Sequence, residues 1–239
     1  MLLCDVDGNL FASEEPAFEV STEVINAFLS SHGVQVTLEA GDMRAESVGR
    51  SFRHTLAAVA SQFGVELGDT ETERWVVAER KAVTARLASA LRPDQAVMAP
   101  LVRLARQVPL ATVSSSAAER IAVCLEVTGL SGLFPAERRF SAEDSLDEPA
   151  SKPDPAVYLH ACRRLGVDPA KAVAVEDSLP GVLSAVGAGI PTIGNVQFVK
   201  EGERDGRRAE LLRAGAASVV ESWDQLELAL FPSSLADGG

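Results

Sequence analysis

Two carboxylates near the start of the chain, Asp5 and Asp7, stand where a short apolar run ends. The preceding residues, 2–4, predict a buried strand, and Gly8 lets the backbone turn away after it. Side chains at i and i+2 of an extended strand share a face, so both carboxylates would reach one site beyond the strand. Open α/β sheets bind their ligands at that end of the strands. An Asp-x-Asp pair also occurs in calcium loops and solvated turns, so the pair alone leaves its chemistry open.

Three further polar groups lie near later apolar runs. Val108–Val113 leads into Ser114-Ser115-Ser116, and Ala172–Val175 leads into Glu176-Asp177-Ser178. Lys152 lies between them, at a helix entry that contains two prolines, in Ser151-Lys152-Pro153-Asp154-Pro155. Each group has a simpler interpretation when taken singly: helix caps for the serines and the acidic pair, and a solvated surface residue for the lysine. If the strands are parallel, however, their ends point the same way and the groups converge on one crevice.

The elements that would position these groups fall into two blocks. From about Ser13 to Leu91 the apolar residues recur at helical spacing, and Arg92-Pro93-Asp94 breaks the pattern. From Pro100 onward, helices alternate with strands, which predicts a parallel sheet with right-handed crossovers. The later segments are expected as helices at 101–107, 118–128, 155–165, 180–188, 209–214 and 225–230, strands at 108–113, 172–175, 191–193 and 217–220, and a polar connection at 200–208.

Composition sets limits on the function. The 239 residues are 46% hydrophobic, which is enough for one large core with a smaller satellite domain. A net charge of −12 argues against nucleic acid or an anionic membrane as the main partner. The three cysteines are scattered in apolar runs and indicate buried thiols. With no signal-peptide pattern or long apolar run, a soluble cytoplasmic protein is expected.

The four polar groups, taken in order, resemble the motifs of the haloacid dehalogenase superfamily, specifically its branch of helical-cap phosphatases and β-phosphoglucomutase-like proteins. The resemblance rests on Asp5-Val6-Asp7-Gly8-Asn9-Leu10, Ser114-Ser115-Ser116, Lys152-Pro153-Asp154-Pro155 and Val175-Glu176-Asp177-Ser178-Leu179-Pro180-Gly181. It implies an α/β fold, with a Rossmann-like parallel sheet core flanked by helices (1-13 and 92-239) and an inserted small α-helical cap domain (14-91). Asn9 departs from the pattern, because most members carry threonine there.

The resemblance also implies a role for each matching residue. Asp5 would be the nucleophile that accepts the phosphoryl group, and Asp7 the general acid and base. The Ser114 hydroxyl and the Ser115 backbone N–H would bind the phosphoryl oxygens. Lys152 would neutralise charge on the nucleophile and on the transferring group.

The resemblance implies a Mg²⁺ ion held by Asp5, Asp177 and the backbone carbonyl of Asp7, with Glu176 at its edge. Simple electrostatics favours a metal too. Carboxylate pairs 4 Å apart repel by roughly 4 kcal/mol at an effective dielectric constant near 20, and one lysine does not offset four carboxylates. A hard divalent cation with oxygen ligands resolves this repulsion.

The expected reaction is hydrolysis of a small phosphorylated metabolite, of the sugar phosphate or phosphoglycolate type, by a monomer or homodimer. A phosphomutase of the β-phosphoglucomutase type is the alternative, although residues 14–18 lack the histidine typical of that branch. A catalytically silent binding domain is a third reading, but it would have lost motif residues that are present here. Arg50, in Val48-Gly49-Arg50-Ser51, is a candidate for gripping the substrate; a solvated arginine at a helix start is the equal alternative.

Overall fold

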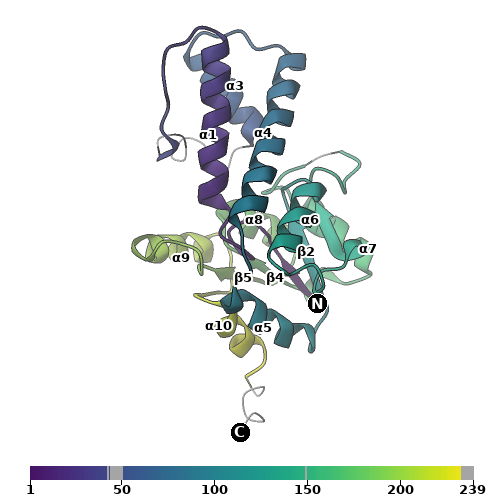
Figure 1. The fold of residues 1–239 in the computed structure, drawn as a ribbon. Coiled ribbons are helices and arrows are strands. Elements are labelled where there is room, and N and C mark those ends of the chain that lie inside the picture. Colours follow the sequence, from purple (N-terminus) through teal and green to yellow (C-terminus); the bar gives the residue numbers. More distant parts are fainter. Residues whose placement is uncertain (42, 44–50, 149, 233–239) are drawn as a thin grey trace. The chain divides into compact units, whose positions relative to one another are not determined.

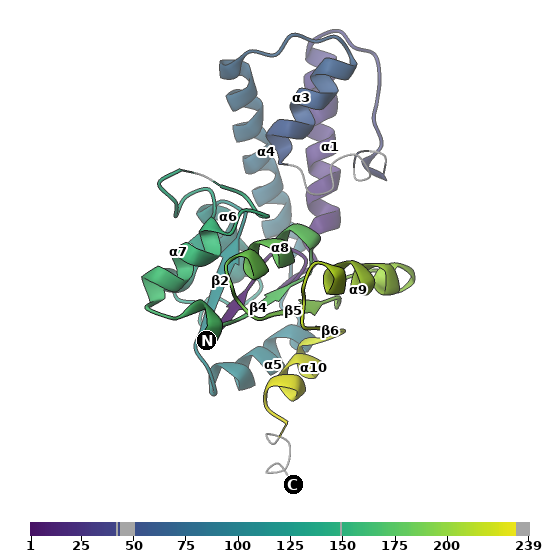
Figure 2. The ribbon, with the colours of Figure 1, turned by 180° about the vertical axis from the view of Figure 1, so that it is seen from behind.

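The computed structural model describes residues 1–41, 43, 51–148 and 150–232. The chain divides into two compact units. The first combines Met1–Ala12 with Leu91–Gly239, and the second is Ser13–Ala90. The two units are described separately below (Figures 1 and 2).

The first unit is built on a six-stranded sheet in which every neighbouring pair of strands is parallel, in the order β3-β2-β1-β4-β5-β6. The predicted α/β fold with a parallel sheet is thereby confirmed. The strand β3 was not predicted, because its three residues include a single apolar side chain, Phe140. The strands are β1 Leu2–Cys4, β2 Leu110–Ser114, β3 Arg139–Ser141, β4 Val173–Glu176, β5 Thr192–Asn195 and β6 Ser218–Val220.

The helices of this unit flank the sheet (Figure 2). One buried cluster joins Leu3 of β1 and Val113 of β2 to Val157 and Ala161 of α7 and Ala185 of α8. Helices α5 and α10 lie side by side in both views. The helices are α5 Gln95–Ala105, α6 Ala118–Val127, α7 Ala156–Leu165, α8 Leu179–Gly187, α9 Arg204–Arg213 and α10 Trp223–Leu230, with short 3₁₀ turns at Ala136–Arg138, Pro169–Lys171 and Glu201–Glu203.

Helix α9 corrects one expectation from the sequence. The polar stretch 200–208 was expected as a connection, but α9 already begins at Arg204. Leu211 is the only side chain of this helix that is buried. A helix that buries so little has almost no apolar stripe, so hydrophobic periodicity could not mark its first turn.

The strand order places the ligand-binding edge of the sheet. From β1 the chain builds β2 and β3 on one side, and then returns to build β4, β5 and β6 on the other. Strands β1 and β4 are therefore neighbours on either side of the point where the chain reverses direction across the sheet, and Cys4 pairs with Val175 there. In open α/β sheets, ligands bind outside the carboxyl ends of the strands at this point.

The second unit contains the helices α1 Glu14–Ser31, α3 Phe52–Gln62 and α4 Asp69–Ala90. Its core joins Ile25, Phe28 and Leu29 of α1 to Leu56 and Val59 of α3. Polar contacts also link α1 and α4. The Ser21 hydroxyl of α1 donates to Glu79 of α4, and the Arg86 guanidinium of α4 donates to Glu19 of α1. In the described parts of both units, no helix has the length and apolar character needed to cross a membrane.

Candidate active site

Asp5 directly follows β1, and the chain then makes a tight turn that carries Asp7. Gly8 adopts φ 73°, a left-handed conformation that favours glycine. Backbone bonds close the turn, from Gly8 N to Phe11 O at 3.0 Å and from Leu10 N to Val6 O at 2.9 Å. Asp5 is 7% exposed, so its carboxylate lies almost entirely inside the protein.

Lys152 joins the carboxyl ends of three neighbouring strands. Its Nζ donates to Asp5 Oδ1 at 2.5 Å, to Glu176 Oε1 at 2.6 Å and to the carbonyl oxygen of Val113 at 2.9 Å. The lysine side chain is 5% exposed. An ammonium group has three hydrogens, and all three are engaged in these bonds. The sequence expectation that Lys152 and Asp5 converge therefore agrees with the geometry, although 147 positions separate them.

Glu176, the last residue of β4, is fully buried beneath the first turn of α8. Its Oε1 also accepts a hydrogen bond from the Tyr158 hydroxyl at 2.5 Å. A Cβ on Gly181 would lie 1.7 Å from Glu176 Oε2, so a side chain at that position would displace the carboxylate. Tyr158 was not among the residues singled out from the sequence. It is the only tyrosine of the chain, and it follows Lys152 by six residues. This short separation from a predicted site residue was the one sequence feature that could have pointed to it.

The serines at the end of β2 and just after it form hydrogen bonds with Asp7, with Lys152 and within the loop. The Ser116 hydroxyl donates to Asp7 Oδ2 at 2.7 Å, and the Ser114 hydroxyl accepts from Ser116 N at 3.0 Å. The Ser115 hydroxyl accepts from Lys152 N at 3.3 Å. The predicted convergence of this loop with the aspartates agrees with these contacts. Ser116, however, was not a predicted site residue, and it is the serine that touches Asp7.

Burial and neighbouring charges shift the pKa of Asp5 and that of Lys152. Burial raises the pKa of Asp5 from 3.8 to about 8; the Lys152 ammonium opposes this rise, and Glu176 and Asp7 add to it. Burial alone would lower the pKa of Lys152, but the charges of Asp5 and Glu176 outweigh it and raise the pKa above its ordinary value. In the absence of a cation, Asp5 therefore retains its proton to a higher pH than an exposed aspartate does.

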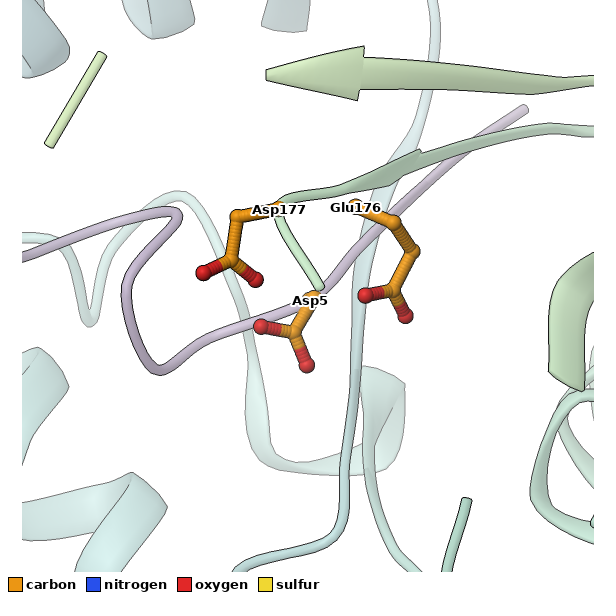
Figure 3. Close-up of side chains that lie close together, drawn as sticks. All are labelled: Asp5, Glu176 and Asp177. Atoms are coloured by element: carbon orange, nitrogen blue, oxygen red, sulfur yellow. The ribbon is translucent and has the colours of Figure 1, made fainter. Parts of the chain in front are cut away.

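This donor set fits a hard divalent cation. Asp5, Glu176 and Asp177 each offer one oxygen, and these atoms lie within 4.8 Å of one another. Figure 3 shows the Asp5 carboxylate between those of Asp177 and Glu176. All the ligand atoms are oxygens, as Mg²⁺ prefers. Lys152 and Tyr158 engage Glu176 Oε1, whereas Glu176 Oε2 is buried and has no hydrogen-bond partner among the described residues.

The second unit contains Arg50, the one site residue predicted there from the sequence, and the nearby His54. Arg50, the candidate for gripping the substrate, lies outside the described residues. His54 is exposed in the first turn of α3, where its Nδ1 lies 2.9 Å from the Ser51 hydroxyl oxygen. This contact is a local helix-start contact, in keeping with a surface position for this histidine.

Comparison with known proteins places this site in a family. The model of haloacid dehalogenase-like hydrolases matches residues 1–189. Protein CbbY of Cereibacter sphaeroides is 30% identical over 237 residues, which cover 94% of this chain and 93% of that protein. Validoxylamine A 7′-phosphate phosphatase of Streptomyces hygroscopicus subsp. limoneus is 29% identical over 194 residues, covering 80% and 83%.

A solved structure agrees with this placement. The HAD family hydrolase of Deinococcus radiodurans, determined with bound phosphate and sodium, superposes with a TM-score of 0.67 at 27% identity, covering 96% of this chain and 93% of that one. The family resemblance inferred from the motifs is confirmed, and so is the expectation of a hydrolase. The chain belongs to the haloacid dehalogenase-like hydrolase family.

Proposed function

We propose that this chain is a Mg²⁺-dependent phosphatase that hydrolyses a small phosphate monoester through an aspartyl phosphate on Asp5. The observation that carries the proposal is the buried Asp5 carboxylate, bonded to Lys152 at the point where the sheet order reverses. Asp7, two residues further on, supplies a second carboxylate in contact with Ser116. Two relatives support phosphate chemistry, one named as a phosphatase and one solved with bound phosphate.

In the first step, a carboxylate oxygen of Asp5 attacks phosphorus and the bond from phosphorus to the ester oxygen breaks. Asp7 donates its proton to the leaving alkoxide, and Lys152 stabilises the negative charge on the nucleophile side. In the second step, Asp7 removes a proton from water, which attacks phosphorus and releases phosphate. Asp5 regains its carboxylate, so no other reactant is consumed.

Asp5, Asp177 and the backbone carbonyl of Asp7 would hold the Mg²⁺ ion, with Glu176 beside it. The ion would neutralise charge on the phosphoryl oxygens and on the carboxylates. Without a cation, the three clustered carboxylates of Asp5, Glu176 and Asp177 would have Lys152 as the described counter-charge, and a phosphate dianion would add to the repulsion. At about 4 Å each carboxylate pair costs roughly 4 kcal/mol at an effective dielectric constant near 20.

The second unit, Ser13–Ala90, is proposed as the cap that selects the substrate. The substrate proposed for this site is a small soluble phosphate monoester of the sugar phosphate or phosphoglycolate type. Arg50 stays the first candidate in the cap for contact with the part of the substrate that is not transferred. The strongly negative net charge of the chain is compatible with such a substrate, because the metal and Lys152 supply the positive charge locally.

The test is phosphate release from a panel of phosphate monoesters, measured with Mg²⁺ and with excess chelator. Asp5→Asn is the matched variant, because it keeps the size of the side chain and removes the nucleophile. We expect metal-dependent turnover that Asp5→Asn abolishes. Full turnover in chelator would exclude the metal, and undiminished turnover by Asp5→Asn would exclude the aspartyl phosphate. An isomeric sugar phosphate without released phosphate would identify a mutase.

A further inference from the structure

Asn9, the residue that departs from the family's usual threonine, is fully buried beside Asp5. Its Nδ2 donates two hydrogen bonds, to the carbonyl oxygens of Asp5 at 3.0 Å and Val175 at 3.1 Å. Its Oδ1 accepts from Asn195 Nδ2 at 2.9 Å. Both amide hydrogens and the amide oxygen are thus engaged. A threonine hydroxyl has one hydrogen to donate, so it could not bond to both carbonyls at once.

The two carbonyls belong to neighbouring strands at the point where they separate. Asp5 N donates to Val175 O at 3.0 Å, one residue beyond the end of β1. The chain then turns at Gly8, and the Asn9 side chain, which follows the turn, donates to the carbonyl oxygens of this same pair, Asp5 and Val175. Asn9 therefore clamps the main chain of Asp5 to β4 from the far side of the turn.

Asn9 is itself fixed from two directions. Asn195, the last residue of β5, is buried, and its Oδ1 accepts from Gln197 N at 3.1 Å, which orients the amide toward Asn9. The carbonyl oxygen of Asn9 accepts from the indole Nε1 of Trp223 at 3.0 Å, and Trp223 is fully buried at the start of α10. The turn that carries Asp5 and Asp7 is thereby anchored to β5 and to the C-terminal helix.

We propose that Asn9 and Asn195 are a positioning pair that fixes the main chain of Asp5 and so directs its carboxylate. The described hydrogen bonds of the pair reach the main-chain carbonyl of Asp5 and not its carboxylate, so the pair acts through backbone geometry. This inference rests on the proposed role of Asp5 as nucleophile. Misplacement of a reacting group by about 1 Å can cost a factor of about 10² in rate, so a modest shift of this turn would be visible in kcat.

Two variants test the pair, and a third is their control. Asn9→Asp keeps the shape but turns an acceptor oxygen toward two carbonyls, and Asn195→Ala removes the group that orients Asn9. Thr192→Val is the matched control, because Thr192 lies at the other end of β5, is buried, and loses a hydroxyl bond to Ile190 O of 2.8 Å. All three variants should lower stability, but Thr192→Val leaves the hydrogen bonds of Asn9 and Asn195 in place.

The first readout separates positioning from stability. We expect kcat of the folded protein to fall about 10- to 100-fold in Asn9→Asp and several-fold in Asn195→Ala, with KM changed far less. Thr192→Val should keep the wild-type kcat. The double variant of Asn9 and Asn195 should be no slower than Asn9→Asp within about twofold, because the two residues act as one unit. Wild-type kcat in both single variants, or strictly multiplicative losses, would overturn the proposal.

The second readout does not depend on turnover. Hydrogen exchange of the backbone amides of residues 5–10 should be faster in both asparagine variants than in Thr192→Val. Equal exchange in all three proteins would overturn the clamp. If the wild-type protein releases no phosphate from any ester, the proposed function fails, and exchange still decides whether the pair holds this turn. If Asn9→Asp does not fold, Asn195→Ala carries both readouts.

Discussion

Replacing Lys152 with methionine removes the only ammonium group among the contacts described for Asp5 and Glu176. The substitution keeps an unbranched side chain in a buried position and deletes three hydrogen bonds. Removing one partner of a buried ion pair costs about 3–5 kcal/mol, because the other charge is left without compensation. In a domain of this size, 1 kcal/mol corresponds to about 2–4 °C in Tm, so we expect a decrease of roughly 6–20 °C.

The stability lost in Lys152→Met should also depend on pH, and the direction of that dependence follows from the raised pKa of Asp5. Its pKa is raised from 3.8 to about 8 in the folded protein, so the stability due to its protonated form is complete below pH 3.8 and is lost as pH rises through about 8. Without Lys152 that pKa rises further. The difference between Lys152→Met and wild type should therefore be larger near pH 9 than near pH 5, because Asp5 would have to ionise unpaired at the higher pH.

Thermal and denaturant unfolding without metal at both pH values measure this difference. Lys171→Met is the control, since this lysine is exposed and its replacement should change stability by less than about 0.5 kcal/mol. A loss in Lys152→Met no greater than that of the control, or one that shrinks as pH rises, would refute the view that Lys152 compensates two buried carboxylates.

Three further expectations follow from the same site. Tyr158→Phe removes a hydrogen bond to the Glu176 carboxylate and should lower the free energy of unfolding by about 1.5–3 kcal/mol, measured by denaturant titration; an unchanged midpoint would contradict it. Ser116→Ala should lower kcat about tenfold with a smaller effect on KM, a fraction of the ~10²–10⁴ that acid–base catalysis contributes; steady-state kinetics decide this. The rise in Tm caused by Mg²⁺ should be larger near pH 9 than near pH 6, because the ion competes with the proton on Asp5, whose pKa is about 8. Asp5→Asn should lose this pH dependence, and an equal rise at both pH values in the wild type would contradict the account.

The site residues that could be predicted from the sequence are mainly those at or just after the ends of buried strands. Asp5, Ser114 and Glu176 stand directly after or at the end of β1, β2 and β4, and the carboxyl ends of parallel strands meet at one edge of the sheet. Apolar runs mark such strands, so the convergence of their polar neighbours could be predicted before any contact was known. The lysine was found because its motif, followed by proline, matched a family pattern.

The supporting residues could not be found in this way. Tyr158 lies on the buried face of α7, where an aromatic side chain reads as ordinary core, and only the position of Glu176 reveals its hydroxyl contact. Asn9 and Asn195 are 186 positions apart, and their pairing depends on the register of β5 against β4. Periodicity carries no information about such contacts between distant polar side chains.

The most direct test of the central claim is whether Asp5 becomes phosphorylated. Asp7→Asn should slow the attack of water while leaving the nucleophile in place, so an intermediate would accumulate after mixing with Mg²⁺ and an ester that has a good leaving group. Acid quenching, proteolysis and mass spectrometry would then locate the added phosphoryl group. The account predicts it on the peptide that contains Asp5, with none in the variant that also carries Asp5→Asn. Turnover by the wild type, with no phosphoryl group on that peptide in Asp7→Asn and activity retained by Asp5→Asn, would contradict the account.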